Sequence, residues 1–520
     1  MSRTVTDNAV GVPPARHVRT LIVGSGFAGL GAAIRLSQQG ETDFVVLERG
    51  PEVGGTWRCN TYPGAACDVP SQLYSYSFAL NPNWSRSFSA QPEIQRYIET
   101  VATRYDVRAR HRFGCEVTGA RWDADRARWE VDTNQGAYTA DVVITAVGAL
   151  CEPALPGIPG VADFEGEIFH SARWNHDADL DGKRVAVIGT GASAIQIVPA
   201  IAPRVAHLDV YQRTAPWLLP RGDRAYTTPE RLAFKYVPGV QRLARLGVYA
   251  AREIQVVGLA KAPIAMKPLE WMARAKLRRE IADPDLRRKL TPNFRIGCKR
   301  MLISNDYYPA LNRDNIDVVT DPIAEVRPNA VVARDGTVRE VDVIVVATGF
   351  HVTDSPTFET IRGRDGHTLA QTFADGGQQA YKGTTIANFP NMFFLVGPNT
   401  GLGHSSMVYM IESQIAYVAD ALATMRRRGL RTVEVRAQEQ HRYNRDLQAK
   451  LAGSVWMTGG CASWYLDAHG NNTTLWPGFT FEFRRQTRQF DIAAYQTTEA
   501  QITGLPNPEE TEQEAQVAVR

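Results

Sequence analysis

The stretch RTLIVGSGFAG, residues 19–29, decides the fold class of this chain. A short apolar run is cut off by Gly24, and apolar residues then recur at helical spacing until Gly40. A second apolar run, Phe44–Leu47, ends at Glu48. This order predicts a strand, a glycine turn, a helix and a second strand, the βαβ unit that holds a dinucleotide pyrophosphate at a helix N-terminus.

Each glycine of the loop has a separate physical role. Gly24 permits the tight turn, Gly26 lets the backbone approach a pyrophosphate, and Gly29 allows the helix to pack closely on the strand. Glu48 follows at the interval expected for a carboxylate that accepts hydrogen bonds from ribose hydroxyls. An acid there favours an unphosphorylated ribose, as in FAD or NAD.

A second unit of the same kind follows later in the chain. The apolar run 184–188 precedes the loop GTGASA, residues 189–194, and a helical pattern then leads to the apolar run 207–211. Arg213 and Thr214 stand after this last run, where the first unit has its acid. A guanidinium and a hydroxyl suit a 2′-phosphate, so the second unit is predicted to bind NADPH.

These patterns predict an α/β protein with two Rossmann-like domains, one for FAD and one for NADP. The apolar runs 141–146 and 341–347 lead into glycines at which the chain crosses between domains. The predicted domains are a discontinuous FAD-binding domain, 18–150 plus 350–505, and an NADP-binding domain, 151–349. A basic helical insertion is expected at about 225–290, with solvated helix faces preferred over a membrane-surface contact. The tails 1–17 and 506–520 are expected to be flexible and disordered.

The bulk numbers fit a soluble enzyme. The chain has 520 residues, of which 44% are hydrophobic and 22% charged, and its net charge of +3 gives no reason to expect a nucleic-acid partner. No secretory signal and no apolar stretch of about 18 residues is visible, so a cytoplasmic protein without stable membrane insertion is expected. The six cysteines are scattered, which predicts free thiols, no disulfide framework and no metal site.

The string FEGEIFHSARWN, residues 164–175, resembles the FxGxxxHxxxW fingerprint of the flavin-dependent Baeyer–Villiger monooxygenases. The strings GGTW (54–57) and YPGAACD (62–68) resemble the flavin-facing segment of the same family. The resemblance covers nearly the whole chain. It implies an enzyme that uses NADPH to reduce FAD, adds dioxygen at flavin C4a, and converts a ketone to an ester or lactone through the resulting peroxide.

The resemblance also implies site residues. Arg300 and Asp68 are the expected catalytic pair, in which Asp68 orients the guanidinium that holds the peroxide anion and its ketone adduct. The glycine loops and the resemblance together predict the residues that contact FAD: Gly24, Gly26, Phe27, Ala28, Gly29, Glu48, Gly55, Thr56, Trp57, Ala66, Cys67, Asp68, Tyr74, Val117 and Met407. The residues predicted on the NADP side are Gly189, Thr190, Gly191, Ala192, Ser193, Ala194, Arg213, Thr214, Lys299, Arg300, His170, Trp174 and Trp464.

One residue departs from the family pattern. Asn175 stands where proline or aspartate usually follows the fingerprint tryptophan. An enzyme that oxygenates nitrogen or sulfur therefore stays open as an alternative, although Trp174, Asp68 and Arg300 favour ketones. A catalytically inactive flavin-binding protein is less favoured, because Asp68 and Arg300 are both present.

Two further points concern cysteines and substrate. A disulfide reductase of the same architecture needs a redox cysteine pair next to the first domain, and Cys59 and Cys67 are too far apart for that pattern. Met301, Leu302 and Leu402 indicate an apolar ketone, but the pattern leaves its identity open. Whether the protein is a monomer or a homo-oligomer also stays open.

Overall fold

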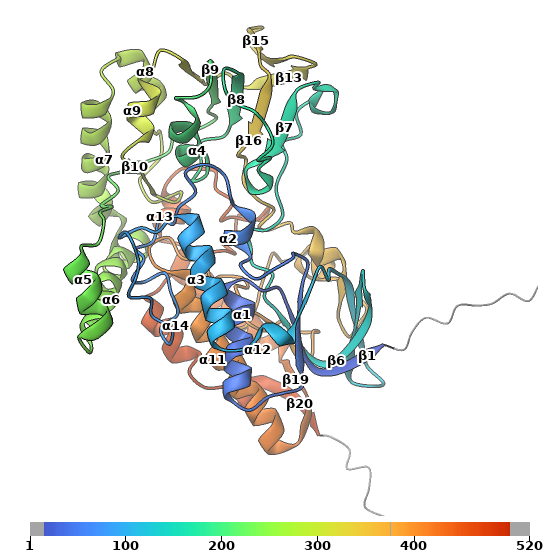
Figure 1. The fold of residues 1–520 in the computed structure, drawn as a ribbon. Coiled ribbons are helices and arrows are strands. Elements are labelled where there is room, and N and C mark those ends of the chain that lie inside the picture. Colours follow the sequence, from blue (N-terminus) through green and yellow to red (C-terminus); the bar gives the residue numbers. More distant parts are fainter. Residues whose placement is uncertain (1–14, 375, 500–520) are drawn as a thin grey trace, which may run out of the picture.

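The computed structural model describes residues 15–374 and 376–499, and Figure 1 shows their arrangement. The predicted C-terminal tail at 506–520 and most of the predicted N-terminal tail lie outside these residues. The first strand begins at Arg16, so it includes the last two residues of the predicted N-terminal tail. None of the described helices is long and apolar enough to cross a membrane.

The first sheet combines strands from both ends of the chain. Its order is β17-β4-β5-β6-β1-β2-β3, and β18 pairs in parallel with β6. β1 lies between β2 and β6 and is parallel to both, as the glycine-loop unit requires. The strands are β1 (Arg16–Val23), β2 (Phe44–Glu48), β3 (His111–Phe113), β4 (Val117–Asp123), β5 (Arg128–Thr133), β6 (Gly136–Thr145), β17 (Ile361–Arg362) and β18 (Met392–Phe394).

Helices cover one face of this sheet. Helix α1 (Phe27–Gln38) follows the first glycine loop, and helix α11 (Met407–Arg428) packs against it. The contact is close, because a Cβ at Gly31 of α1 would lie 2.8 Å from the Ile415 side chain. Ile22, Val46 and other apolar residues of the sheet join both helices in one buried core. Helix α3 (Gln91–Arg104) packs in the same core, so α1, α3 and α11 form one layer and the sheet forms the next.

The second sheet is smaller and entirely parallel. Its order is β12-β9-β8-β16-β7. Helices α4 (Ala194–Ile201) and α9 (Tyr307–Leu311) lie on one face, and a three-stranded antiparallel sheet covers the other. The strands are β7 (Glu167–His170), β8 (Arg184–Ile188), β9 (His207–Tyr211), β12 (Ile316–Val319) and β16 (Val343–Val346), with β13 (Ile323–Arg327), β14 (Ala330–Ala333) and β15 (Val338–Glu340) in the antiparallel sheet.

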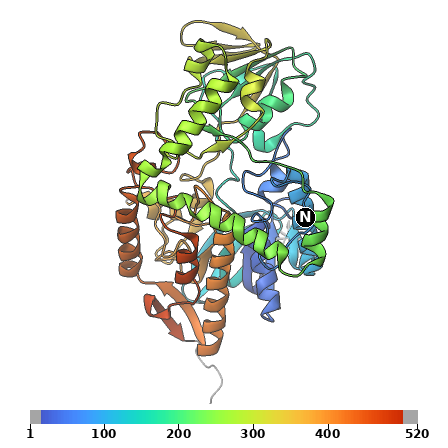
Figure 2. The ribbon, with the colours of Figure 1, turned by 90° about the vertical axis from the view of Figure 1, so that its left-hand side faces the viewer.

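A run of helices lies between β9 and β12 in sequence and along one side of the molecule in space, the side turned to the viewer in Figure 2. It begins at Thr227, whose side chain caps the first helix together with Glu230. Its elements are α5 (Thr228–Tyr236), α6 (Val240–Glu253), η4 (Val257–Lys261), η5 (Pro263–Met266), α7 (Lys267–Glu280) and α8 (Pro284–Lys289), flanked by β10 (Leu218–Leu219) and β11 (Leu302–Ile303).

The remaining elements complete the layers around the two sheets. The α-helices and strands are α2 (Thr56–Cys59), α3 (Gln91–Arg104), α10 (Leu369–Ala374), β19 (Leu430–Val435), α12 (Ala437–Leu451), α13 (Val455–Thr458), α14 (Thr480–Gln486) and β20 (Tyr495–Glu499). The short 3-10 helices are η1 (Arg108–Arg110), η2 (Val161–Asp163), η3 (Ser171–Arg173), η6 (Pro356–Glu359) and η7 (Ile492–Ala494).

The prediction that all six cysteines are free thiols is wrong for two of them. Cys298 and Cys461 form a disulfide across 163 residues of sequence. No spacing rule could reveal this pair, because the fold brings together two segments that are distant in the chain. The other four cysteines, Cys59, Cys67, Cys115 and Cys151, are free.

Candidate active site

The two glycine loops have the same geometry. Gly24 has φ +97°, and a Cβ there would lie 2.7 Å from the carbonyl oxygen of Ala146. Gly189 has φ +116°, and its Cβ would lie 2.4 Å from the carbonyl oxygen of Ala347. In each sheet the loop passes the end of the neighbouring strand so closely that only glycine fits. The structure therefore contains two equivalent dinucleotide-binding turns.

The helices that follow these loops differ in how closely they pack. A Cβ at Gly29 of α1 would lie 1.9 Å from the carbonyl oxygen of Gly24, whereas α4 begins with a fully buried Ala194 at the matching place. Neither helix has a side-chain cap at its N-terminus. Their first N–H groups therefore stay available to bind a pyrophosphate.

Glu48 lies at the carboxyl end of β2, beside the first loop. Its side chain is buried and accepts hydrogen bonds from the backbone N–H groups of Ser25 (2.8 Å) and Gly50 (2.7 Å). These two bonds fix the carboxylate next to the loop on which a dinucleotide is expected. Contact of Glu48 with a ribose stays a prediction.

Three residues predicted on the FAD side form one aromatic cluster. Trp57 donates a hydrogen bond from Nε1 to the Tyr74 hydroxyl (3.1 Å), and the Phe27 ring meets Tyr74 edge-on at 5.3 Å. Burial raises the pKa of Tyr74, so its hydroxyl stays neutral. Gly55 brings this cluster to the first loop, because its Cβ position would lie only 2.9 Å from the Cα of Gly26. Thr56 then begins α2.

Arg300 and Asp68 form a bidentate ion pair. Nε of Arg300 donates to one carboxylate oxygen at 2.6 Å, and Nη2 donates to the other at 2.8 Å. Nη1 donates to the carbonyl of Leu402 at 3.2 Å. Burial favours protonated Asp68, but the charge of Arg300 and its hydrogen bonds outweigh burial and hold the pKa of Asp68 below its usual range. The charge of Asp68 raises the pKa of Arg300, so both groups are ionised at neutral pH.

Lys299 and Arg213 approach each other without a shared carboxylate. Burial lowers the pKa of Lys299, and the positive charge of Arg213 lowers it further. Neither side chain forms an ion pair with any residue that the structure describes. Two such cations are suited to a phosphate, and their binding of one stays a prediction. Thr214 follows, and its carbonyl accepts a hydrogen bond from the Thr190 hydroxyl (3.0 Å).

The fingerprint histidine lies at the end of β7, where it meets the end of β16. Nε2 of His170 lies 3.0 Å from the carbonyl oxygen of Gly349, and Nδ1 accepts a hydrogen bond from the Ala172 N–H at 3.1 Å. Both contacts are satisfied only by the neutral tautomer with its proton on Nε2. Burial lowers the pKa of His170, which also favours the neutral ring.

The neighbouring fingerprint residues have structural contacts of their own. Trp174 packs edge-on against Phe169, with ring centroids 4.9 Å apart, in the core of the second sheet. Asn175 accepts a hydrogen bond from the Asp177 N–H (3.0 Å), as a turn cap does. The departure at Asn175 is therefore compatible with the local turn.

The late segment adds an apolar wall next to the ion pair. Leu402 is buried with Trp456 and Tyr465, and Met407, the first residue of α11, packs against them. Trp464 is half exposed and meets the Tyr465 ring at 4.6 Å. Val117 does not join this group: it begins β4 and packs against the core on the other face of the first sheet.

Gln196 is a contact residue that the sequence did not indicate. It lies on α4, and its side chain accepts hydrogen bonds from the Tyr62 hydroxyl (3.0 Å) and the Ala66 N–H (3.2 Å). It also donates to the Ala66 carbonyl at 3.0 Å. This side chain therefore joins the second dinucleotide unit to the flavin-facing segment, next to Asp68. A glutamine within a helical pattern carries no sequence signal for such a role.

The expectation of solvated faces on the basic insertion is wrong for one face of α6. Arg245 donates to the carbonyls of Gln72 (2.8 Å) and Leu73 (3.2 Å). Further along the same helix, the buried Glu253 accepts hydrogen bonds from Thr480 and contacts His404. Arg252, the residue before it, is also largely buried. The spacing of 245 and 252, two helical turns, was the signal that could have indicated an inward face.

Arg252 adds a third charge to the site. Its positive charge contributes to lowering the pKa of Asp68, and burial lowers the pKa of Arg252 itself. Asp68 therefore faces cations from two elements, the segment before β11 and helix α6. The helical insertion thus contributes a positive charge that acts on Asp68.

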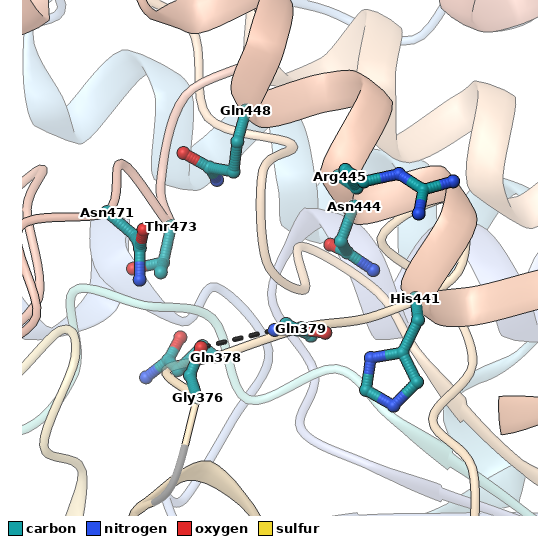
Figure 3. A pocket seen from close by; sticks show the side chains of 9 residues that line it. All are labelled: Gly376, Gln378, Gln379, His441, Asn444, Arg445, Gln448, Asn471 and Thr473. Atoms are coloured by element: carbon teal, nitrogen blue, oxygen red, sulfur yellow. Dashed lines mark hydrogen bonds between the residues drawn. The ribbon is translucent and has the colours of Figure 1, made fainter. Parts of the chain in front are cut away.

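Two other features lie outside this cluster. His207, Asp209 and Asp317 lie close enough to hold a metal ion, but Arg339 already donates hydrogen bonds to Asp209 (2.7 Å) and Asp317 (2.8 Å), and its positive charge offsets one of the two carboxylates. None of the predicted site residues lines the second feature, a cavity of about 300 Å³. Figure 3 shows the side chains around it. Its wall consists of Gly376, Gln378, Gln379, His441, Asn444, Arg445, Gln448, Asn471 and Thr473.

Two sheets, each with parallel strands around a matched glycine loop, have an acid after one loop and cations after the other. They define an oxidoreductase with two dinucleotide sites. Comparison with known proteins narrows this class. Residues 21–231 match the family model described as pyridine nucleotide-disulphide oxidoreductase. A Baeyer–Villiger monooxygenase of Streptomyces coelicolor is 53% identical over 92% of each chain, and one of Pseudomonas aeruginosa is 52% identical over 95% of this chain and 94% of its own.

Solved structures agree with these relatives. The cyclohexanone monooxygenase of Rhodococcus sp. Phi1 bound to NADP+ superposes with a TM-score of 0.83 at 29% identity, covering 94% of this chain and all of that one. A steroid monooxygenase bound to NADP has a TM-score of 0.82 at 32% identity with the same coverage. The chain belongs to the Baeyer–Villiger monooxygenase family. It is an FAD- and NADPH-dependent monooxygenase, as the resemblance implied.

Proposed function

We propose that Arg300 and Asp68 carry the oxygen-transfer step and that the substrate is an apolar ketone. The observation that carries this proposal is the bidentate pair itself. Asp68 and the Leu402 carbonyl engage three of the five guanidinium N–H groups, which leaves two for other partners. A cation held in this way is preorganised to bind negative charge that develops on a reacting oxygen.

The cofactors have matching places in the chain. The first loop, Glu48 and the Phe27–Trp57–Tyr74 cluster would hold FAD, and the second loop with Arg213 and Lys299 would hold NADPH. When bound, FAD activates dioxygen and NADPH supplies the reducing electrons. The neutral hydroxyl of Tyr74 and the uncapped N-terminus of α1 fit an anionic dinucleotide, because neither adds negative charge.

The wall beside Arg300 supports an apolar substrate. Leu402 is buried there, and Met301 and Met407 pack against the same cluster. Leu302, which the sequence also indicated, is buried in the core of the second sheet instead. Burial of a hydrocarbon chain or ring against such a surface favours binding by roughly 25 cal/mol for each Å² of apolar surface buried. Only the carbonyl group then needs a polar partner, and Arg300 provides one. We place the enzyme in the cytoplasm, where NADPH is available.

A panel of ketones tests this proposal. Linear, cyclic, aromatic and steroidal ketones are incubated with the FAD-loaded enzyme, NADPH and air, and a sulfide and an amine serve as competing substrates. NADPH consumption and product mass are measured together, because consumption alone also arises when hydrogen peroxide is released. An ester or lactone heavier than its ketone by one oxygen supports the proposal. A sulfoxide or N-oxide as the only product contradicts it.

A further inference from the structure

The helical insertion presents apolar side chains to solvent. The helices α5, α6 and α7 lie along the side of the molecule that faces the viewer in Figure 2. Ten of the sixteen large hydrophobic side chains that are exposed among the described residues belong to this run of the chain. They are Leu232, Tyr236, Val237, Leu243, Leu246, Ile254, Val257, Ile264, Trp271 and Met272. Such a concentration marks an interaction surface.

Cations are interspersed with these apolar side chains along the chain. Residues 228–280 contain four acids, Glu230, Glu253, Glu270 and Glu280, and none of them is exposed. The exposed charged residues are all basic: Arg231, Lys235, Arg242, Lys261, Lys267, Arg278 and Arg279. Of these, only Arg279 forms an ion pair within the described part of the chain, with Glu280. We call these apolar and basic side chains together the basic-apolar face.

We propose that the basic-apolar face docks on the surface of an anionic lipid bilayer. Helices that combine Lys and Arg with Trp, Leu and Ile side chains lie in the interface, where the apolar groups enter the acyl boundary and the cations meet lipid phosphates. A second copy of the chain fits this face poorly, because its own cations would repel those of the first. The occupant therefore has negative charge and an apolar layer beneath it.

This docking brings the site close to a source of apolar ketones. Helix α6 has Leu243 and Leu246 exposed to solvent, while Arg252 and Glu253 of the same helix face inward toward Asp68 and His404. One element thus joins the basic-apolar face to the site. The docking goes beyond the proposed function and does not depend on which ketone is used.

Vesicle flotation of the FAD-loaded enzyme tests the docking. Vesicles of phosphatidylcholine with one-third phosphatidylglycerol should carry the protein at low salt, and pure phosphatidylcholine vesicles should carry at least tenfold less. High salt should release it, since screening weakens the attraction of the phosphates. The triple variant Leu243→Ser, Leu246→Ser, Trp271→Ser and the triple variant Lys235→Gln, Arg242→Gln, Lys267→Gln should each lower binding at least tenfold.

A matched control and a second measurement complete the test. The double variant Leu155→Ser, Arg204→Gln removes exposed residues elsewhere and should bind vesicles like the wild type. Light scattering after gel filtration reports the mass of each variant. Failure of the wild type to float with anionic vesicles at low salt would overturn the proposal. So would a dimer that the apolar triple variant converts to a monomer, because the face then binds a second copy.

A second inference rests on the disulfide. Cys298 is buried directly before Lys299 and Arg300, on a segment packed among Phe294, Ile296 and the core of the insertion. Cys461 is only partly buried and begins the irregular loop 461–464, which carries the half-exposed Trp464. The disulfide therefore joins the partly exposed loop 461–464 to the buried segment that precedes Lys299.

We propose that this disulfide is a redox-controlled tie that holds the Trp464 loop against the NADP-binding cations. This inference rests on the proposed role of Lys299 and on the prediction that Trp464 lies on the NADP side. A dithiol reductant breaks the S–S bond in two exchange steps: its thiolate attacks the accessible sulfur of Cys461, the Cys298 thiolate leaves, and the second thiol of the reductant releases Cys461. The protein gains two thiols and the reductant becomes a disulfide. Disulfides in a reducing cytoplasm are usually redox-responsive.

Reduction should loosen the loop without unfolding the protein. In wild type treated with dithiothreitol, and in Cys298→Ala and Cys461→Ala, KM for NADPH should rise at least threefold, and ester formed per NADPH should fall. Flavin content should stay unchanged, because Phe27, Ala28 and helix α1, which follow the first glycine loop, pack in a different core cluster. Chymotrypsin should cleave after Trp464 faster in all three. The double variant should equal either single variant and should not respond to dithiothreitol, since one bond is lost in every case.

The controls separate this inference from the proposed function. Cys151→Ser removes a free thiol and should behave like the wild type in every assay. Alkylation followed by mass spectrometry counts the free thiols, and chymotrypsin cleavage reports the exposure of Trp464. Neither measurement requires the enzyme to turn over a ketone, so both test the disulfide even if the proposed function is wrong. Six alkylated cysteines in the untreated, unfolded protein would overturn the inference. Unchanged cleavage and unchanged KM after verified reduction would do so as well.

Discussion

At the scale of single residues, substitution of Arg300 should affect one part of the catalytic cycle and spare the other. Reduction of FAD by NADPH requires cofactor geometry, whereas ketone oxygenation also requires a cation at the reacting oxygen. Arg300→Ala should bind FAD and be reduced by NADPH, yet its ester yield should fall about 10²–10³-fold, as expected when one preorganised electrostatic group is lost. Arg300→Lys should not rescue it, because an ammonium cannot reproduce the fork that Asp68 engages.

Three parallel measurements check this prediction. Anaerobic reduction of the flavin is followed by its absorbance, ester by mass, and hydrogen peroxide by a coupled assay. The expected pattern is retained flavin reduction, little ester and increased peroxide. A normal ester yield would remove Arg300 from the proposed role and would favour nitrogen or sulfur oxygenation.

Arg213 should decide coenzyme choice. Its cation lies beside that of Lys299, and a 2′-phosphate would relieve their repulsion. A charge-assisted hydrogen bond contributes roughly 1.5–3 kcal/mol, so Arg213→Ala should lower the preference for NADPH over NADH by about ten- to hundredfold. Steady-state kcat/KM for both coenzymes measures this preference. Equal use of NADPH and NADH by the wild type would contradict the assignment.

His170 should make stability depend on pH. Burial lowers its folded pKa below the ordinary value of about 6.5, so the folded protein holds fewer protons than the unfolded chain just below that pH. The contribution of neutral His170 to the free energy of unfolding is therefore complete above about pH 6.5. It is lost as the pH falls toward the pKa of His170 in the folded protein. His170→Gln should remove part of this acid sensitivity, measured as the pH dependence of the unfolding midpoint. His111, whose pKa burial also lowers, should keep the rest.

At the scale of elements, the glycine loops set the distance between strand and helix. Gly29→Ala should push α1 away from β1, because its Cβ would lie 1.9 Å from a carbonyl oxygen. The core between α1 and α11 then opens, and overpacking of this kind typically costs about 1–3 kcal/mol. The expected result is a lower unfolding midpoint and loss of bound FAD.

The second loop offers a matched comparison for that variant. A Cβ at Gly191 would meet nothing within 4 Å, so Gly191→Ala should leave the unfolding midpoint unchanged. Because Gly191 is where the backbone would approach the pyrophosphate, KM for NADPH should still rise. Equal destabilisation by both substitutions would contradict the steric argument.

At the scale of the whole molecule, the two dinucleotide units meet through Gln196. Its three hydrogen bonds to Tyr62 and Ala66 join α4 to the segment that ends at Asp68. Gln196→Ala should loosen this contact and raise KM for NADPH severalfold, while FAD content and the Arg300–Asp68 pair remain. Small-angle scattering with and without NADP+ measures the change in domain arrangement. An unchanged scattering profile and an unchanged KM would assign the contact to local packing only.

The sequence by itself determined the elements that depend on local chemistry. The apolar run at β1, the turn at Gly24 and the helical spacing of α1 agree with the structure, because neighbouring residues dictate a strand, a positive φ and a helix. The second unit, β8 to β9, follows the same rule. The pairing of Arg300 with Asp68 was expected only through resemblance to the family, since 232 residues separate them.

Only the tertiary structure decided the contacts between distant segments. The Cys298–Cys461 disulfide, the Gln196 bridge and the inward face of α6 each join parts of the chain whose local patterns are ordinary. A scattered cysteine, a helical glutamine and a basic helix have no local preference for these partners. Their roles arise when packing of the two sheets and the insertion brings them together. The spacing of 245 and 252 could indicate an inward face of α6 but not its partners, and no spacing in the sequence could indicate the disulfide or the Gln196 bridge.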